Sequence, residues 1–255
     1  MATGGVGNMS AGDETTGAPD SFDTYAANRD DPSFTNWLRR RAEPDWTDTV
    51  THQFVRELGS GELADDAFRR YLVRDYAFVE TLVGTVGRAV GDAPTMEAKS
   101  SLTEFLTVLT DDENDYFERA FEALDVPEAT DADPELTASS RAFVDLLERA
   151  GREGGYPETL AVLVPAEWIY LEWATDMPPE RPDRFYLAEW IDLHNNDSFG
   201  DFVTWLRGEL DREGAMVSPQ RQRGLERLFR RTVELEFAFF AAAYDQEMSE
   251  AGRRW

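Results

Sequence analysis

The chain has 255 residues, no cysteine, and a formal charge of −26 at pH 7 that arises from 51 acidic and 25 basic side chains. Without cysteine it has no disulfide, no thiolate ligand for a metal and no thiol nucleophile. The negative charge repels phosphate groups, so nucleic acid and anionic membranes are disfavoured as partners.

The pattern of apolar residues predicts one helical domain. Residues 1–30 are rich in Gly, Ala, Ser, Thr and Asp without apolar periodicity, so we expect a disordered tail followed by a folded domain over residues 31–255. Beyond this tail the apolar spacing is helical throughout. Helices are expected over residues 33–41, 45–58, 64–91, 95–125, 135–152, 156–177, 183–193, 197–213 and 218–248. With no internal repeat, the sequence favours an all-α, multi-helix bundle.

An acidic residue interrupts the apolar face of the helix expected over 64–91. Spacing of i, i+3, i+4 and i+7 defines that face, which contains Phe68, Tyr71, Leu72, Phe78, Val79 and Leu82. Asp75 falls within the face, whereas Arg70 and Arg74 are expected outside it, in solvent. Burying a carboxylate is costly unless partners compensate for it, so Asp75 marks a special position.

Two later helices also carry acids where apolar residues are expected. The segment LAVLVPAEWIYLEW is apolar nearly all round, yet it contains Glu167 and Glu172, so at least one of these is expected inside the protein. The last long helix has a core-facing stripe of Leu225, Leu228, Phe229, Thr232, Val233, Phe240 and Ala243. Glu236 falls on this stripe, whereas Glu234 falls on the arginine-rich, solvent side.

Three acids on the inner faces of three helices, each flanked by aromatic residues, predict a polar pocket in the bundle core. The alternative is that each acid pairs with an arginine or caps backbone donors of another helix. The sequence holds only His52 and His194 and no Glu-x-x-His motif, so it indicates no metal site. It also lacks a Gly-x-Ser-x-Gly turn and phosphate-binding glycine loops. The chemistry that remains is acid/base catalysis by carboxylates. It suits a flat, nitrogen-rich molecule whose faces stack against aromatic side chains.

Five segments between about Pro44 and Tyr244 resemble, in order and spacing, the TenA family, also called thiaminase II. They are HQFVRELGSGEL, FRRYLVRDYAF, LAVLVPAEWIYLEW, YLAEWIDLHNNDSF and ELEFAFFAAAY. The resemblance implies a haem-oxygenase-like helical bundle, no cofactor and commonly a homotetramer. It also implies a small-molecule substrate, since the family hydrolyses aminopyrimidines such as 4-amino-5-aminomethyl-2-methylpyrimidine in thiamin salvage, and some members cleave thiamin itself.

The resemblance also assigns individual residues. Asp75 matches the acid that holds the amino group of the pyrimidine, and Glu236 matches the glutamate that pairs with the ring nitrogen and the exocyclic amine. Ala166 stands where many members have a catalytic cysteine, so the chain resembles the Cys-less, glutamate-type branch. Three positions where the family has tyrosines hold other residues here, namely Phe78, Ala138 and His194. The pocket is therefore expected to carry fewer hydroxyl groups than usual.

From these matches we expect Glu236, Glu167 and Asp75 to be catalytic. Glu236 would share a proton with the pyrimidine ring, Asp75 would fix its amino group, and Glu167 would position or deprotonate the attacking water, with Glu172 as the alternative. The expected substrate-binding residues are Asp75, Phe78, Tyr170, His194 and Phe239. An ion pair remains the alternative for Glu167, as does a place in the core or at its rim for His194, Tyr170 and Phe239.

Two other function classes stay open at this point. One is a haem-oxygenase-like oxidoreductase, against which the shortage of histidine argues, and the other is a non-catalytic pyrimidine-binding or regulatory protein.

The acidic surplus and the single lysine, Lys99, indicate salt adaptation, because salt screens the repulsion among surface carboxylates. A cytoplasmic location is expected, since the sequence shows neither a membrane-length apolar run nor the start of a signal peptide.

Overall fold

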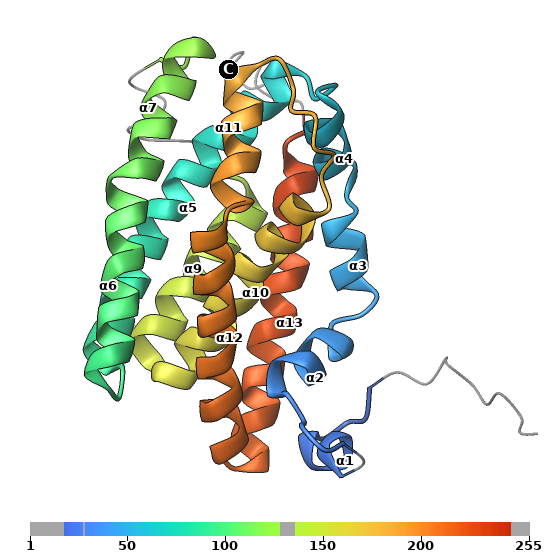
Figure 1. Ribbon diagram of the computed structural model, residues 1–255, viewed down its shortest axis with the longest axis vertical. Coiled ribbons are helices and arrows are strands. Elements are labelled where there is room, and N and C mark those ends of the chain that lie inside the picture. The colour runs from blue at the N-terminus through green and yellow to red at the C-terminus, as the bar shows by residue number, and fades with distance from the viewer. Residues whose placement is uncertain (1–17, 28, 128–135, 246–255) are drawn as a thin grey trace, which may run out of the picture.

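The computed structural model describes residues 18–27, 29–127 and 136–245, and within these ranges the chain forms helices and no strand. Figure 1 shows the long helices running alongside one another in one bundle, which confirms the all-α prediction. The helices are α1 (Phe22–Ala26), α2 (Phe34–Arg41), α3 (Asp45–Val50), α4 (Gln53–Ser60), α5 (Asp65–Asp92), α6 (Met96–Thr110), α7 (Asp112–Ala123), α9 (Ala138–Glu153), α10 (Tyr156–Thr175), α11 (Phe185–His194), α12 (Asp197–Met216) and α13 (Pro219–Ala242).

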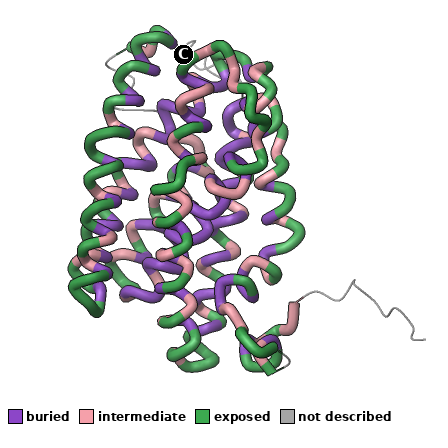
Figure 2. The backbone as a smooth tube through the Cα atoms, in the orientation of Figure 1, coloured by how far each residue is buried: buried purple, intermediate pink, exposed green. Residues whose placement is uncertain are grey.

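Helix α10 occupies the centre of the bundle because its sequence is apolar on every side. All its residues from Leu160 to Tyr170 are buried, and the helix contacts α13, α12, α9, α11 and α5. In Figure 2 the buried positions of the surrounding helices face inward, while their outer faces are exposed. Any acid on the buried stretch of α10 therefore lies in the protein interior.

Helix α5 buries the apolar face that its spacing predicts, from Phe68 to Leu82, and Asp75 is buried with it. The expectation that Arg74 is solvated is wrong, since only 6% of this residue is exposed. Its Nη1 donates to the carbonyl oxygen of Ala242 at 2.7 Å, and Nε of Arg70 donates to that of Ala243 at 3.0 Å. The last carbonyls of a helix lack helical donors, so these two arginines of α5 satisfy the end of α13.

Two expected helices are each divided in the structure. The helix expected over 45–58 separates into α3 and α4 at Thr51 and His52, where Nδ1 of His52 accepts a hydrogen bond from the Phe54 amide at 3.1 Å and caps α4. The helix expected over 95–125 separates into α6 and α7 at Asp111, whose backbone angles (φ −110°, ψ −81°) leave the helical region. The helix expected over 218–248 ends at Ala242, and residues 246–248 lie outside the described residues.

Part of the expected tail belongs to the folded protein, whereas residues 1–17 lie outside the described residues. Phe22 and Tyr25 on α1 are buried, and the ring of Phe22 meets that of Phe34 with centroids 5.1 Å apart. The indole nitrogen of Trp37 donates to the carbonyl oxygen of Pro19 at 2.8 Å. These aromatic contacts hold a segment that is too short to show periodicity in the sequence.

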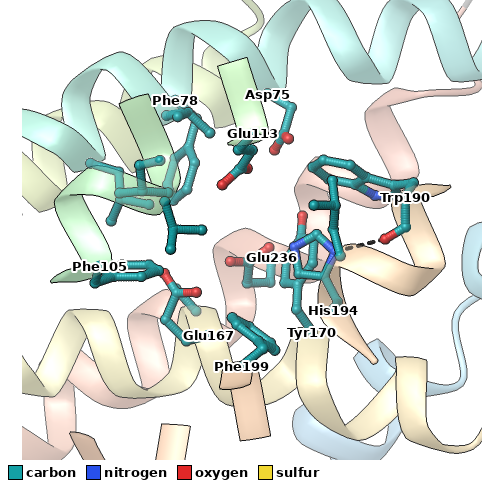
Figure 3. A pocket seen from close by; sticks show the side chains of 16 residues that line it. Asp75, Phe78, Phe105, Glu113, Glu167, Tyr170, Trp190, His194, Phe199 and Glu236 are labelled. Carbon is teal, nitrogen blue, oxygen red and sulfur yellow. Dashed lines mark hydrogen bonds between the residues drawn. The ribbon is translucent and has the colours of Figure 1, made fainter. Parts of the chain in front are cut away.

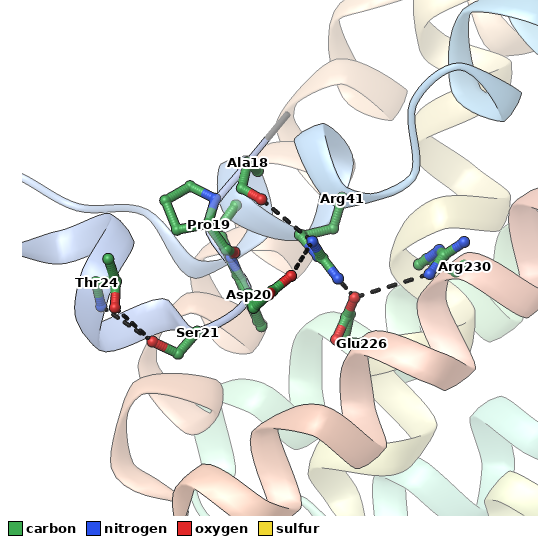
Figure 4. Close-up of polar contacts among 9 residues, drawn as sticks. Ala18, Pro19, Asp20, Ser21, Thr24, Arg41, Glu226 and Arg230 are labelled. Atoms are coloured by element: carbon green, nitrogen blue, oxygen red, sulfur yellow. Dashed lines mark hydrogen bonds and ion pairs between the residues drawn. The ribbon is translucent and has the colours of Figure 1, made fainter. Parts of the chain in front are cut away.

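Arg41 fastens the same segment to the bundle (Figure 4). Its guanidinium donates to the carbonyl oxygen of Ala18 at 3.2 Å, to Oδ1 of Asp20 at 2.8 Å and to Oε1 of Glu226 on α13 at 2.8 Å. The acid on α13 is thus buried beside a cation.

Among the described helices none is long and apolar enough to cross a membrane.

Candidate active site

A cavity opens into the bundle core among α5, α6, α7, α10, α11, α12 and α13. It holds about 540 Å³ of empty space, including its open mouth. Four acids line it, Asp75, Glu113, Glu167 and Glu236. Figure 3 shows the carboxyl groups of Asp75 and Glu113 near each other, with Glu167 and Glu236 reaching the same space from other helices.

Asp75 and Glu236 meet in this cavity as predicted, although α5 and α13 are far apart in the sequence. Only 3% of Asp75 and 1% of Glu236 is exposed. Oε1 of Glu236 is buried and has no hydrogen-bond partner among the described residues. Two residues earlier on the same helix, Glu234 pairs with Arg231 at 2.9 Å. The helical spacing therefore separates the inner acid of α13 from the outer one correctly.

The choice between Glu167 and Glu172 depends on where each residue lies on α10. Glu167 lines the cavity, as does its neighbour Ala166. Glu172 points elsewhere, and its Oε1 accepts from Nη2 of Arg39 on α2 at 2.6 Å. Glu172 thus forms an ion pair of the kind considered as the alternative for Glu167. Glu167 is the acid of α10 that lines the cavity.

Glu113 is the lining acid that the sequence reasoning missed. It is the second residue of α7, in the acidic run DDEND, and 9% of it is exposed. Acids in the first turn of a helix are common because they complement the helix dipole, so this run gives no sign of a site. A signal did exist, since Glu113 shares helical spacing with the buried residues Tyr116, Phe117 and Ala120.

Aromatic side chains form much of the cavity wall (Figure 3). Phe78 and Tyr170 line it as expected, together with Phe105, Trp190 and Phe199. The hydroxyl groups of Tyr170 and Tyr71 lie 2.7 Å apart in a hydrogen bond. Such walls can cover both faces of a flat ring, while the Tyr71 contact fixes the orientation of the Tyr170 hydroxyl.

His194 also lines the cavity, so it is not an isolated core residue. Its Nδ1 lies 2.8 Å from the carbonyl oxygen of Trp190. A carbonyl oxygen only accepts hydrogen bonds, so Nδ1 carries the hydrogen and donates it. Burial lowers the pKa of His194 to about 4, which keeps the ring neutral at physiological pH. Nε2 is then left as an acceptor.

Two sequence-based expectations about the pocket wall are wrong. Phe239 does not line the cavity but packs behind it, with its ring centroid 6.2 Å from that of Phe78 and 5.5 Å from that of Tyr71. The position three residues after Glu236 on α13 turns toward α5 instead of the open space. Ala138 is exposed at the first residue of α9 and does not line the cavity, so no hydroxyl group is lost from the wall at this position.

Burial raises the pKa of every acid in the cavity. The pKa of Asp75 lies well above its ordinary value because of burial and the charges of Glu113 and Glu167. Burial and the charges of Asp75 and Glu167 raise the pKa of Glu236 in the same way. Burial brings the pKa of Glu113 to about 8, and burial together with the charge of Glu113 brings that of Glu167 to about 8. Near neutral pH the carboxyl groups of this cavity therefore hold protons.

No lysine or arginine occurs among the described residues that line this cavity. Nor does the described part of the chain contain three or more His, Asp or Glu side chains in an arrangement that could hold a metal ion. Asp75 has the Tyr71 hydroxyl as a neighbouring hydrogen-bond donor, and protons, water or a ligand that brings N–H donors can satisfy the rest of the carboxyl groups. A flat molecule with several nitrogen atoms meets both the polar and the aromatic demands of the site.

The fold and the site together define an all-helical protein with an acid-lined, aromatic-walled ligand cavity in its core. Residues 39–246 match the TENA/THI-4/PQQC family, and the chain belongs to that family. Solved structures of TenA homologues from Pyrococcus horikoshii and Pyrococcus furiosus have this fold. The first superposes with a TM-score of 0.71 at 23% identity over 83% of this chain and 98% of that one. The second has a TM-score of 0.74 at 20% identity over 83% and 100%. The expected haem-oxygenase-like bundle is confirmed.

Two curated relatives match over nearly their whole length. A protein of Halalkalibacterium halodurans that is named aminopyrimidine aminohydrolase is 24% identical over 218 residues, which cover 85% of this chain and 97% of that protein. One of Helicobacter pylori with the same name is 25% identical over 214 residues, covering 82% and 97%. This chain is therefore similar to these two proteins over most of its length.

Proposed function

We propose that this protein hydrolyses thiamin-related aminopyrimidines, with 4-amino-5-aminomethyl-2-methylpyrimidine as the reference substrate. The observation that carries the proposal is that Asp75, Glu167 and Glu236 converge in one buried cavity with aromatic walls. Family membership and the names of the relatives from H. halodurans and H. pylori support it. The proposed reaction replaces the amino group of the aminomethyl substituent by a hydroxyl group.

Asp75 and Glu236 bind and polarise the pyrimidine in this proposal. Asp75 accepts a hydrogen bond from the ring amino group. Glu236 faces a ring nitrogen and shares a proton with it, which is consistent with its raised pKa and with the unpartnered Oε1. Holding this proton on the ring withdraws electrons from the exocyclic methylene carbon, which makes this carbon more susceptible to attack by water.

Glu167 activates the water that attacks this carbon. As its ionised form it accepts a proton from the water while the new C–O bond forms and the C–N bond breaks, and it then passes that proton to the departing ammonia. The substrate ammonium ion and one water become the hydroxymethyl compound and one ammonium ion, so atoms and charge balance. Ala166 leaves no thiol beside Glu167, so this mechanism uses water directly.

The walls position the ring for this step. Phe78 and Tyr170 contact its faces, and His194, whose Nδ1 is occupied by the Trp190 carbonyl, offers Nε2 as an acceptor to a substrate N–H group. Phe239 supports Phe78 from behind. No cofactor or metal is assigned a step.

The test is incubation of the purified protein with the aminomethylpyrimidine, its formylated form and thiamin in molar KCl, followed by chromatography. We expect the hydroxymethylpyrimidine and ammonia to appear from the aminomethyl compound. If the protein binds this compound without converting it, the catalytic proposal is wrong and a binding or regulatory function takes its place. If it neither binds nor converts any of the three, the assignment of the cavity to aminopyrimidines is wrong.

We propose further that the protein is a homotetramer adapted to high salt. Large apolar side chains at Phe185, Phe237 and Met216 are exposed on the single chain, and a subunit interface would cover such surface. The charge of −26 supports the salt requirement, because only screening makes this repulsion tolerable. Light scattering after size-exclusion chromatography in molar KCl tests the assembly, and a mass of one chain would contradict it.

A further inference from the structure

The mechanism above leaves one acid of the cavity without a task. Glu113 is nine-tenths buried on α7 and lines the cavity, yet its carboxyl group makes no ion pair and no hydrogen bond in the described part of the chain. Its neighbour Asn114 is used in the fold, since Oδ1 of Asn114 accepts from the Tyr76 hydroxyl at 3.1 Å. A buried acid without a partner costs stability, so Glu113 needs an account of its own.

The surroundings of Glu113 contain negative groups and hydrocarbon. Its charge acts on Asp75 and on Glu167, whereas Glu236 is influenced by Asp75 and Glu167. Glu113 therefore lies close enough for its charge to act on both Asp75 of α5 and Glu167 of α10, and all three line the same cavity. Figure 3 shows it between Asp75 and Phe78, with its carboxyl group directed into the cavity.

The position of Glu113 suits a ligand group that is both cationic and able to donate several hydrogen bonds. The cavity offers no arginine or lysine that would neutralise Glu113 and Glu167. Two carboxylates that line one cavity of low polarity attract an ammonium group more strongly than exposed ones do, because water competes less. A neutral hydroxyl group at the same place would gain hydrogen bonds but no charge neutralisation.

We propose that Glu113 and Glu167 form an ammonium subsite that binds the exocyclic aminomethyl group of the substrate, so that Glu113 selects the charged substrate over the neutral product. This inference rests on the proposed function, since it assigns the end of the cavity that the pyrimidine ring leaves free. Glu113 contacts the departing nitrogen, whereas Asp75 and Glu236 contact the ring. After hydrolysis the hydroxymethyl product has no charge at this subsite and leaves it more readily.

The experiment compares the binding of two compounds that differ only in this group. The aminomethylpyrimidine and the hydroxymethylpyrimidine are titrated by calorimetry into the parent protein, Glu113→Gln and Glu122→Gln in molar KCl. Glu122 lies on the same helix and is exposed, so its substitution controls for a change of charge on α7. Thermal unfolding of each variant checks the fold, and Gln preserves the volume of Glu.

We expect Glu113→Gln to weaken the binding of the aminomethyl compound by about tenfold or more, which is the usual range for a buried hydrogen bond to a charged group. Binding of the hydroxymethyl compound should stay unchanged in this variant, and Glu122→Gln should bind both as the parent does. Equal effects of Glu113→Gln on the two compounds, or none on either, would overturn the subsite. A parent protein that binds neither compound would instead overturn the proposed function, and the subsite with it.

Proton release gives a second readout that a structural role would not move. An ammonium group bound at Glu113 requires this carboxyl group to lose its proton, as does binding at Glu167, while Asp75, Glu236 and His194 face the same space. At pH 7 the parent should release protons when it binds the aminomethyl compound, measured by calorimetry in two buffers of different ionisation enthalpy. Fewer protons should leave Glu113→Gln, and an unchanged number would contradict the proposal.

Discussion

Buried acids occur in two regions of this protein, and the two regions treat them differently. At the periphery of the bundle each buried acid has a partner of fitting chemistry. Glu226 accepts from Arg41 at 2.8 Å, and Glu209 accepts from the Tyr156 hydroxyl at 2.9 Å and pairs with Arg212. These pairs join helices or turns of one helix, so their role in holding the fold is clear. Burial by itself therefore does not identify a functional acid.

The core cavity collects four acids without any arginine or lysine among its described lining residues. No fold requires such a concentration, because like charges in a site of low polarity raise one another's pKa and cost free energy of folding. A site that keeps unfavourable groups together is typical of function, where a ligand supplies the missing partner. Acids with an ionic or hydroxyl partner at the periphery should therefore affect stability when substituted, whereas the acids of the cavity should affect activity.

The largest effect should separate the two acids of α10. We expect Glu167→Gln to lower the turnover of aminopyrimidine by a factor of about 10² to 10⁴, the usual contribution of a general base. Its matched control, Glu172→Gln, should keep the parent rate because Glu172 pairs with Arg39 outside the cavity. Turnover rates are measured by product chromatography. Equal loss of turnover in both variants would show that lining the cavity does not distinguish Glu167 from Glu172.

Breaking a peripheral pair should destabilise the fold. Arg41→Met leaves the carboxylate of Glu226 buried without its main partner and also removes the contacts to Ala18 and Asp20. The free energy of unfolding should fall by about 1–3 kcal/mol, measured by denaturant unfolding. Adding Glu226→Gln should recover part of the loss, since it removes the stranded charge. A double variant no more stable than Arg41→Met would contradict this explanation.

The cavity acids should instead make the protein less stable as pH rises. Glu113 and Glu167 each have a pKa of about 8 in the folded state against an ordinary value of 4.5, so the folded protein holds more protons between these values. Their contribution to stability is present below pH 4.5 and is lost as the pH rises through 8. His194 has the opposite sign, since its contribution is present above pH 6.5 and is lost as the pH falls through about 4.

This dependence can be measured as the melting temperature between pH 6.5 and 8.5 at constant KCl, a window in which His194 stays neutral. Glu113→Gln should flatten the decline relative to the parent protein, and the exposed control Glu122→Gln should follow the parent. A parallel decline in all three proteins would place the titrating groups outside the cavity.

A smaller effect should come from salt. Lowering KCl from molar to about 0.1 M lengthens the range of charge repulsion on the surface to about 10 Å, so the melting temperature should fall. Buried groups are screened much less, so the difference between the parent and Glu113→Gln should persist at both salt concentrations. If melting did not depend on KCl, the salt adaptation inferred from the charge of −26 would be wrong.

The same comparison explains which parts of the site the sequence predicts. Asp75 and Glu236 lie on amphipathic helices, where the spacing of apolar residues defines an inner face, so both were placed correctly. Helix α10 is apolar all round and has no such face, and only the position of Arg39 on α2 separates Glu172 from Glu167. Glu113 was missed because an acidic first turn is also what an ordinary surface helix carries.

The fold follows the sequence to a similar degree. The helical periodicity predicts the bundle and most of its helices, but the breaks at His52 and Asp111 arise from a side-chain cap and from a local change of backbone angles that periodicity does not record. Helix α1 is held by contacts of Phe22 with Phe34 and Trp37, which belong to a helix later in the chain. Periodicity in the sequence therefore predicts that a helix forms, whereas tertiary contacts of this kind determine where the helix begins and ends.

The two glutamates that lie two residues apart on α13 allow the role of the buried acids to be tested. Turnover of 4-amino-5-aminomethyl-2-methylpyrimidine is measured for the parent, Glu236→Gln and Glu234→Gln, with thermal unfolding to show that each variant is folded. We expect Glu236→Gln to lose most of the activity and Glu234→Gln, which only breaks a surface pair with Arg231, to retain it. A folded Glu236→Gln protein that works at the parent rate would contradict the central role of the unpaired acids in the core.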